Sequence, residues 1–91
     1  MIHVEGHRLA LSGPLNMSTV AGAVEAGRRA VALGATEIDL SAATEIDSAA
    51  VALLLDWIRT AKKPLEITGM PSAMASLASL YGVDGLIPRP I

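Results

Sequence analysis

The sequence predicts one small α/β domain over residues 1–91, with a mixed four-stranded sheet in the order β-β-α-β-α-β-α. Three observations support this fold class. A chain of 91 residues suffices for one small hydrophobic core and is too short for two. Its 52% hydrophobic content comes mainly from Ala, Leu, Val and Ile, with no Phe, one Trp and one Tyr, which suits helices packed on a sheet. Short alternating stretches, typical of strands, are separated by stretches with helical spacing.

The N-terminal segment is predicted to form a β-hairpin. The pattern alternates weakly, with Ile2 and Val4 and then Leu9 and Leu11 at alternate positions on either side of the turn-like segment 5–8. Residues 12–14, Ser-Gly-Pro, should end the second strand, because glycine and proline interrupt regular strands.

The first helix is expected to begin after Asn16, a good N-cap, and to end before Gly34, a natural C′ residue. The residues that repeat at helical spacing between them are Met17, Val20, Ala21, Val24, Gly27 and Val31. A glycine inside a helix costs up to about 1 kcal/mol relative to alanine. Gly22 and Gly27 should therefore be tolerated best where the helix lies close to the sheet.

The middle of the chain should contain a strand at 36–41, a loop at 42–46 and a strong helix running to about residue 62. Asp47 or Ser48 should cap this helix. Two lysines and a proline, residues 62–64, should end it, because cations suit the negative end of the helix dipole and proline prevents continuation. The expected core stripe is Val51, Leu54, Leu55 and Ile58.

This helix has more apolar surface than one stripe needs. Leu53 and Trp57 lie four residues apart on a flanking line that includes Ala50. Either the helix is buried over a wide arc, or Trp57 anchors a partner, since Trp is enriched at interface hot spots. We expect burial, because a small domain needs its only large aromatic side chain in the core.

The last elements are a strand at 65–68 and a helix that begins with Pro71 at its first position and stops at Gly82. The apolar positions of this helix are Met74, Leu77, Ala78 and Tyr81, and residues 83–91 should form a loop. Because the carboxyl ends of parallel strands lie along one edge of a sheet, loops 13–16, 41–47 and 69–71 should gather there. This edge is the first place to expect a functional site.

Composition and motifs exclude several classes of function. Seven basic and nine acidic residues leave a formal charge of −2, without the basic clusters that nucleic-acid binding requires. The absence of Cys excludes disulfides, thiolate catalysis and Cys-based zinc sites. His3 and His7 have no third ligand at a diagnostic spacing, and neither a serine-hydrolase motif nor a phosphate-binding glycine loop is present. The sequence therefore predicts no enzyme, no metal and no cofactor.

Nothing in the sequence predicts insertion into a membrane. The longest apolar run, 49–55, is far shorter than the roughly 20 residues that a membrane span needs. The N-terminus lacks the basic and apolar regions of a signal peptide. We therefore expect a soluble, cytoplasmic protein.

Asp47 and Ser48 are the most informative polar residues, because they lie at the start of the strongest helix and on the expected functional edge. Both fit an ordinary N-cap, a role worth about 1 kcal/mol. Ser48 can also present a free hydroxyl in the first turn. A phosphate there would lie at the positive end of the helix dipole and add about two negative charges to a docking surface.

The chain resembles the STAS domain family in residues 38–48, IDLSAATEIDS, and in the AAVALLL that follows them. Residues 8–16 are similar to the strand and turn that precede the first helix in this family. The resemblance covers about residues 8–89 and implies a single STAS domain that acts as a protein-binding module. In this family the position of Ser48 holds a Ser or Thr, and in anti-sigma-factor antagonists it is the phosphorylation site. Asn16 stands where an acidic residue is common, and Ala49-Ala50 stand where many members carry a Ser or Gly pair.

One subgroup of the family fits best. The chain is similar to the small cytoplasmic STAS subunit of the Mla phospholipid-transport ABC complex in residues 61–63, 68–69, 77–83 and 86–89. This resemblance implies a non-catalytic subunit that binds the ABC-transporter ATPase at the inner face of the inner membrane and supports assembly or activity. The implied interface residues are Asp47, Ser48, Ala49, Ala50, Asn16 and Met70.

Two other functions remain open at this stage. The first is an anti-sigma-factor antagonist, which binds an anti-sigma-factor kinase and is released when Ser48, the possible phosphoacceptor, is phosphorylated. The second is a domain that binds a small ligand or nucleotide, because helix N-termini attract anions.

Overall fold

The fold is built on a mixed four-stranded sheet. The computed structural model describes residues 2–83 and 85, and the sheet order is β1-β2-β3-β4. The strands are β1 (Ile2–Glu5), β2 (Arg8–Pro14), β3 (Glu37–Thr44) and β4 (Glu66–Thr68). β1 pairs antiparallel with β2, whereas β2, β3 and β4 run parallel. The predicted α/β class, element order and antiparallel edge are confirmed.

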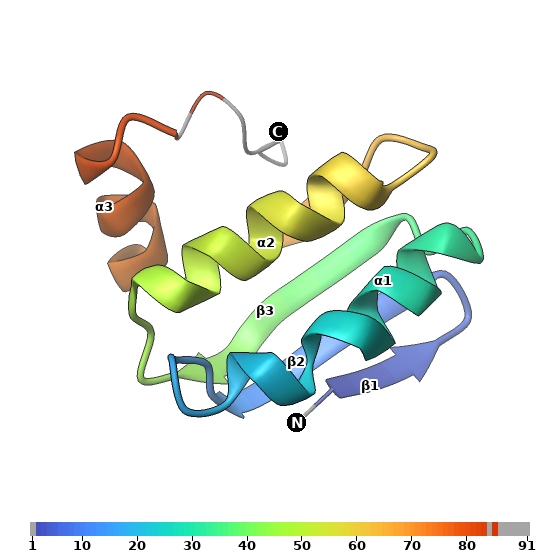
Figure 1. Cartoon of the computed structure of the whole chain (residues 1–91), viewed down its shortest axis with the longest axis horizontal. Helices are drawn as coiled ribbons and strands as arrows, with labels where there is room; N and C mark the ends of the chain where they lie inside the picture. The colour runs from blue at the N-terminus through green and yellow to red at the C-terminus, as the bar shows by residue number, and fades with distance from the viewer. Residues whose placement is uncertain (1, 84, 86–91) are drawn as a thin grey trace.

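The helices cover one face of this sheet. They are a short 3-10 turn, η1 (Val20–Gly22), and three α-helices, α1 (Val24–Ala32), α2 (Ser48–Thr60) and α3 (Ser72–Leu80). Figure 1 shows α1 and α2 side by side on the same face of the sheet, with α3 beside the start of α2. The core lies between sheet and helices, and its largest fully buried side chains are Trp57, Leu9, Ile38, Leu40, Leu54, Ile67, Met74 and Val31.

Strands β2 and β3 are both longer than the sequence predicted. β2 continues through 12–14 and β3 through 42–44, and these segments pair with each other after a register irregularity between Ala10 and Ser12. Pro14 is the last residue of its strand, and the next N–H, that of Leu15, donates to the Thr44 carbonyl at 2.8 Å. The strand ends at Pro14, within the predicted segment 12–14, but Ser12 and Gly13 still belong to it, because pairing with a distant strand outweighs local propensity.

The first α-helix begins at Val24, not after Asn16 as predicted. The Asn16 side chain accepts from the Ser18 N–H at 2.9 Å, and the Thr19 hydroxyl donates to the Pro14 carbonyl at 2.9 Å. These local bonds compete with helix formation, so 16–19 form turns before η1. The other end is as predicted, since Gly34 follows the C-cap with a φ of 110° that favours glycine.

Helix α2 begins as predicted and buries a wider arc than the expected stripe. The Asp47 carboxylate caps it by accepting from the Ala49 N–H at 2.8 Å. The helix ends at Thr60, two residues earlier than expected. Its buried residues are Ala50, Val51, Leu53, Leu54 and Trp57, whereas Leu55 and Ile58 are half-buried. Trp57 has no exposed surface, which confirms that it belongs to the core.

The bounds of the C-terminal strand and helix differ from the predicted bounds by single residues. Strand β4 begins at Glu66, and Pro71 is the N-cap of α3 rather than its first helical residue. Gly82 follows the C-cap with a φ of 71°, as its predicted stop position requires. The predicted loop 83–91 lies outside the described residues except for 83 and 85. Within the described part of the chain, no helix is long and apolar enough to cross a membrane.

Candidate protein-binding site

Asp47 ties two loops of the predicted functional edge together. Its Oδ1 caps α2 through the Ala49 N–H, and its Oδ2 accepts from the Met17 N–H at 3.0 Å. The loop after β2 is therefore held against the start of α2, although the two segments are separated by 30 positions in the sequence. This arrangement leaves the Met17 side chain 77% exposed.

Ser48 is the first residue of α2 and is exposed. Among the residues that the structure describes, none forms a hydrogen bond with its hydroxyl. The hydroxyl therefore lies free at the positive end of the α2 dipole, where an added phosphate would be stabilised by the helix.

The other predicted interface residues differ in how accessible they are. Ala49 and Asn16 are half-buried beside Ser48 and Asp47, whereas Ala50 has no exposed surface and belongs to the core. Ala50 therefore cannot contact a partner in this conformation of the chain. Met70 is half-buried in the loop after β4, which lies on the other side of β3 from Asn16.

The loop that holds Met70 approaches β3 closely through Gly69. A Cβ on Gly69 would lie 2.7 Å from the Ser41 Cβ and 2.8 Å from the Ser41 N. Gly69 also has a φ of 64°, so both packing and backbone favour glycine here. Together with the Asp47 contacts, this approach confirms that loops 13–16, 41–47 and 69–71 gather at one edge of the sheet.

A groove beside this edge was not predicted from the sequence. It lies between the η1–α1 segment and α2, with a volume of about 280 Å³. Its lining residues are Val20, Val24, Arg28, Ala49, Ala52, Leu53 and Asp56. The sequence carries a weak signal for it, because the Val20/Val24 and Ala49/Ala52 pairs have helical spacing. Only the packing of the two helices turns these pairs toward each other.

An ion pair closes one end of the groove. Arg28 donates from Nε and from a terminal nitrogen to the two Asp56 oxygens, both at 2.8 Å, and to Glu25 Oε1 at 3.1 Å. The hydrogen bonds and charge of Arg28 hold the pKa of the Asp56 carboxyl below its usual value, although burial opposes this shift. The pKa of Arg28 is raised by the same partners. The guanidinium therefore stays charged and links α1 to α2.

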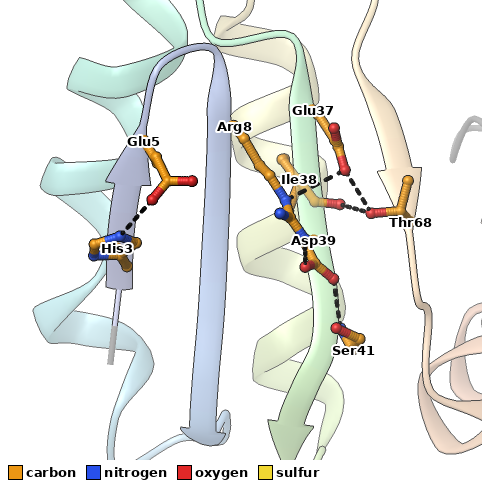
Figure 2. Close-up of polar contacts among 8 residues, drawn as sticks. All are labelled: His3, Glu5, Arg8, Glu37, Ile38, Asp39, Ser41 and Thr68. Carbon is orange, nitrogen blue, oxygen red and sulfur yellow. Dashed lines mark hydrogen bonds and ion pairs between the residues drawn. The ribbon is translucent and has the colours of Figure 1, made fainter.

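The face of the sheet opposite α1 and α2 carries a polar network, drawn in Figure 2. Arg8 on β2 donates to Asp39 and pairs with Glu37 at 3.5 Å, and Thr68 on β4 donates to Glu37 at 3.0 Å. Asp39 also accepts from the Ser41 N–H at 2.9 Å. Hydrogen bonds from Ser41, and then the Arg8 guanidinium, lower the pKa of the Asp39 carboxyl. This network joins β2, β3 and β4, and its groups already pair with one another.

The two histidines form their contacts outside this network. His3 Nε2 is 3.6 Å from a Glu5 oxygen, and His7 Nδ1 is 3.3 Å from the Gly34 carbonyl oxygen. Residues 2–83 and 85 contain no group of three or more His, Cys, Asp or Glu side chains placed to hold a metal ion.

Comparison with known proteins gives matches over nearly the whole chain. The family model described as "Mlab, STAS domain" matches residues 2–88. The chain is 36% identical over 88 residues to the intermembrane phospholipid transport system binding protein MlaB of Escherichia coli (strain K12), an alignment that covers 92% of this chain and 90% of the relative. It is similar to the same degree, with the same coverage, to the protein of that name from Shigella flexneri.

Proposed function

Because the chain belongs to the family described as Mlab, STAS domain, we propose that it is a non-catalytic subunit of a phospholipid-transporting ABC complex, where it binds the ATPase subunit and supports assembly or activity. The observation that carries this proposal is the 36% identity to intermembrane phospholipid transport system binding proteins over nine-tenths of both chains. A subunit of this kind would act at the cytoplasmic face of the inner membrane, where its partners would hold it.

The contact with the ATPase is proposed to centre on the start of α2. Ser48 is exposed there, Met17 is exposed beside it, and Asp47 holds their two segments together. Ala49, Asn16 and Met70 contribute the half-buried borders of this surface.

Affinity purification of the tagged chain from its native cells tests the proposal. We expect the ATPase and the permease of a phospholipid-transporting ABC complex to co-purify, identified by mass spectrometry. A tagged, unrelated small cytoplasmic protein is the control. Recovery of a histidine-kinase-like protein without any ABC subunit would contradict the proposal and favour the anti-sigma-factor antagonist.

Ser48→Glu is expected to weaken binding to the ATPase without unfolding the chain. A carboxylate at the first position of α2 suits the helix dipole, so the free energy of unfolding should stay within about 0.5 kcal/mol of wild type. A new charge at a protein contact must lose its water without gaining a partner, so we expect the affinity to fall about tenfold. Isothermal titration with the purified ATPase measures the affinity, and Ser48→Ala is the matched control. Equal affinities for Ser48→Glu and wild type would place Ser48 outside the contact.

The exposure of Ser48 favours a second candidate function, in which phosphorylation of this residue regulates binding. The Ser48 hydroxyl is exposed, and no described residue bonds to it, so a kinase could reach it without breaking an internal contact. In the alternative function, phosphorylation of this residue would release an anti-sigma-factor kinase. The purification described above separates the two functions by the class of partner.

A further inference from the structure

Strand β1 forms one edge of the sheet and is exposed along its outer side. Among the strands that the structure describes, it pairs with β2 alone, and Val4 in its middle is 51% exposed. Glu5 and Arg8 flank the two-residue turn of this hairpin, so they exchange backbone hydrogen bonds. Because bonded and non-bonded pairs alternate along an antiparallel ladder, the N–H and C=O of Val4 point away from β2. These groups can pair with a further strand.

The side chains of β1 complement a second, antiparallel copy of the same strand. With Val4 opposite Val4 of the second copy, the outward backbone groups of both residues meet, and His3 of each chain lies opposite Glu5 of the other. The His3 ring donates to a carboxylate when neutral and is a cation when protonated, so it suits Glu5 in either state. The two side chains already lie 3.6 Å apart within one strand (Figure 2). Arg8, opposite Glu5 on β2, pairs instead with carboxylates of β3.

Leu33, the C-cap of α1, is the most exposed large apolar side chain in the described part of the chain, at 82%. Helix geometry shows which way it points. Gly27 faces the core, and Arg28 marks the flank of α1 that faces α2, because it bonds to Asp56. Leu33 lies about 120° around the helix from Gly27, on the flank opposite Arg28. Since α1 lies between α2 and the β1 edge in Figure 1, Leu33 is on the β1 side.

An apolar pocket of about 250 Å³ lies beside the other end of β1, between η1 and the sheet. Its lining residues are Ile2, Leu11, Pro14, Leu15, Thr19, Gly22 and Ala23. Ile2 begins β1, whereas Leu33 lies near the β1–β2 turn, because the next carbonyl oxygen, that of Gly34, is 3.3 Å from His7 Nδ1. Antiparallel pairing sets the end of each β1 beside the start of the other. The same pairing therefore brings Leu33 of each copy to the pocket of the other.

We propose that β1 pairs with β1 of a second copy, and that Leu33 of each chain enters the pocket at Ile2 of the other. The backbone register, the pairing of His3 with Glu5 and the position of Leu33 all require the same two-fold axis, which makes every contact occur twice. A strand as short as β1 gives a weak, reversible dimer by itself, and burial of Leu33 adds affinity. The proposal goes beyond the proposed function, because it uses no residue of the proposed ATPase contact.

Sedimentation equilibrium of the purified chain at several concentrations tests the proposal, and we expect a reversible equilibrium between monomer and dimer. Leu33→Gln should raise the dissociation constant of the dimer about tenfold. Leu80→Gln, at a 75% exposed leucine at the end of α3, is the matched control and should leave it unchanged. Val4→Pro should abolish the dimer, because it removes an outward N–H. This N–H does not bond to β2, so the circular dichroism spectrum should match that of wild type.

A charge exchange tests the register. Glu5→Lys places a cation opposite His3 of the other copy and should raise the dissociation constant about tenfold. Adding His3→Glu to this variant restores opposite charges across the two-fold axis. The double variant should therefore return to within about threefold of wild type.

Each alternative result overturns a named part of the proposal. A wild-type chain that stays monomeric at millimolar concentration would overturn the dimer. A dimer that Val4→Pro and Leu33→Gln leave unchanged would overturn the role of β1, and failed rescue by His3→Glu would overturn the register centred on Val4. Loss of ATPase affinity in Leu33→Gln, without self-association of wild type, would assign this edge to the ATPase and overturn the second copy. Failure to recover an ABC complex would contradict the proposed function and leave the dimer standing.

Discussion

Trp57→Ala is expected to lower the free energy of unfolding by about 3–5 kcal/mol. The ring has no exposed surface and packs between α1 and the rest of the core. Its Nε1 donates to the Val24 carbonyl at 3.1 Å, so the substitution also removes this hydrogen bond between α2 and α1. Chemical denaturation followed by circular dichroism measures the loss, because Trp57 is the only tryptophan and fluorescence would lose its probe.

Trp57→Phe is the control for this prediction. It keeps an aromatic ring in the core and removes the Nε1 donor, so its loss should be smaller than that of alanine. If Trp57→Ala kept the wild-type melting temperature and lost ATPase binding, the side chain would have to face a partner. That result would contradict its burial.

Gly27→Ala is expected to destabilise the chain by about 1–3 kcal/mol, although alanine is the better helix former. A Cβ at this position would overlap Cε2 and Cζ2 of the Trp57 ring, and the ring is fully buried and cannot move aside. Helix propensity alone would stabilise the variant by up to about 1 kcal/mol. The two effects have opposite signs, so a single denaturation curve decides between them.

Gly22→Ala provides the matched control for the packing argument. Nothing lies within 4 Å of a Cβ at Gly22, and its φ is not in the left-handed region. Its free energy of unfolding should therefore stay within about 0.5 kcal/mol of wild type or rise slightly. In a Trp57→Leu background, Gly27→Ala should cost less than in the wild type, because the ring that it meets is absent. A stabilising Gly27→Ala would show that α1 and α2 do not approach as closely as described.

The contact between Gly27 and Trp57 also lies beside the groove between η1–α1 and α2. It brings α1 within van der Waals distance of α2 at the level of the ring, one helical turn from Val24. Arg28, the next residue after Gly27, then reaches Asp56 across the same seam. Val20 of the 3-10 helix η1 lines the groove together with Val24 of α1.

Much of the fold and part of the site followed from residue patterns. The alternation in 2–4, 9–11 and 65–68 indicated strands, and Asp47 and Gly34 marked helix ends that the structure places there. Parallel strands joined by helices have their carboxyl ends at one edge, and this geometry predicts that the loop before Ser48 lies at that edge. These inferences succeeded because caps, turns and periodicity depend on neighbours within a few residues.

The errors arose where distant segments decide the outcome. Pairing with 42–44 keeps 12–14 in β2 despite glycine and proline, and Asp47 holds the loop at Met17 30 positions away. The positions of α1 and α3 decide which residues of α2 are buried. Ala50 is one of these buried residues, so it is not available at the surface. The close approach of α1 to α2 requires Gly27, because a Cβ there would overlap the Trp57 ring. Local sequence carries the propensities of single elements, whereas shared hydrogen bonds and close packing between elements form only in the folded chain.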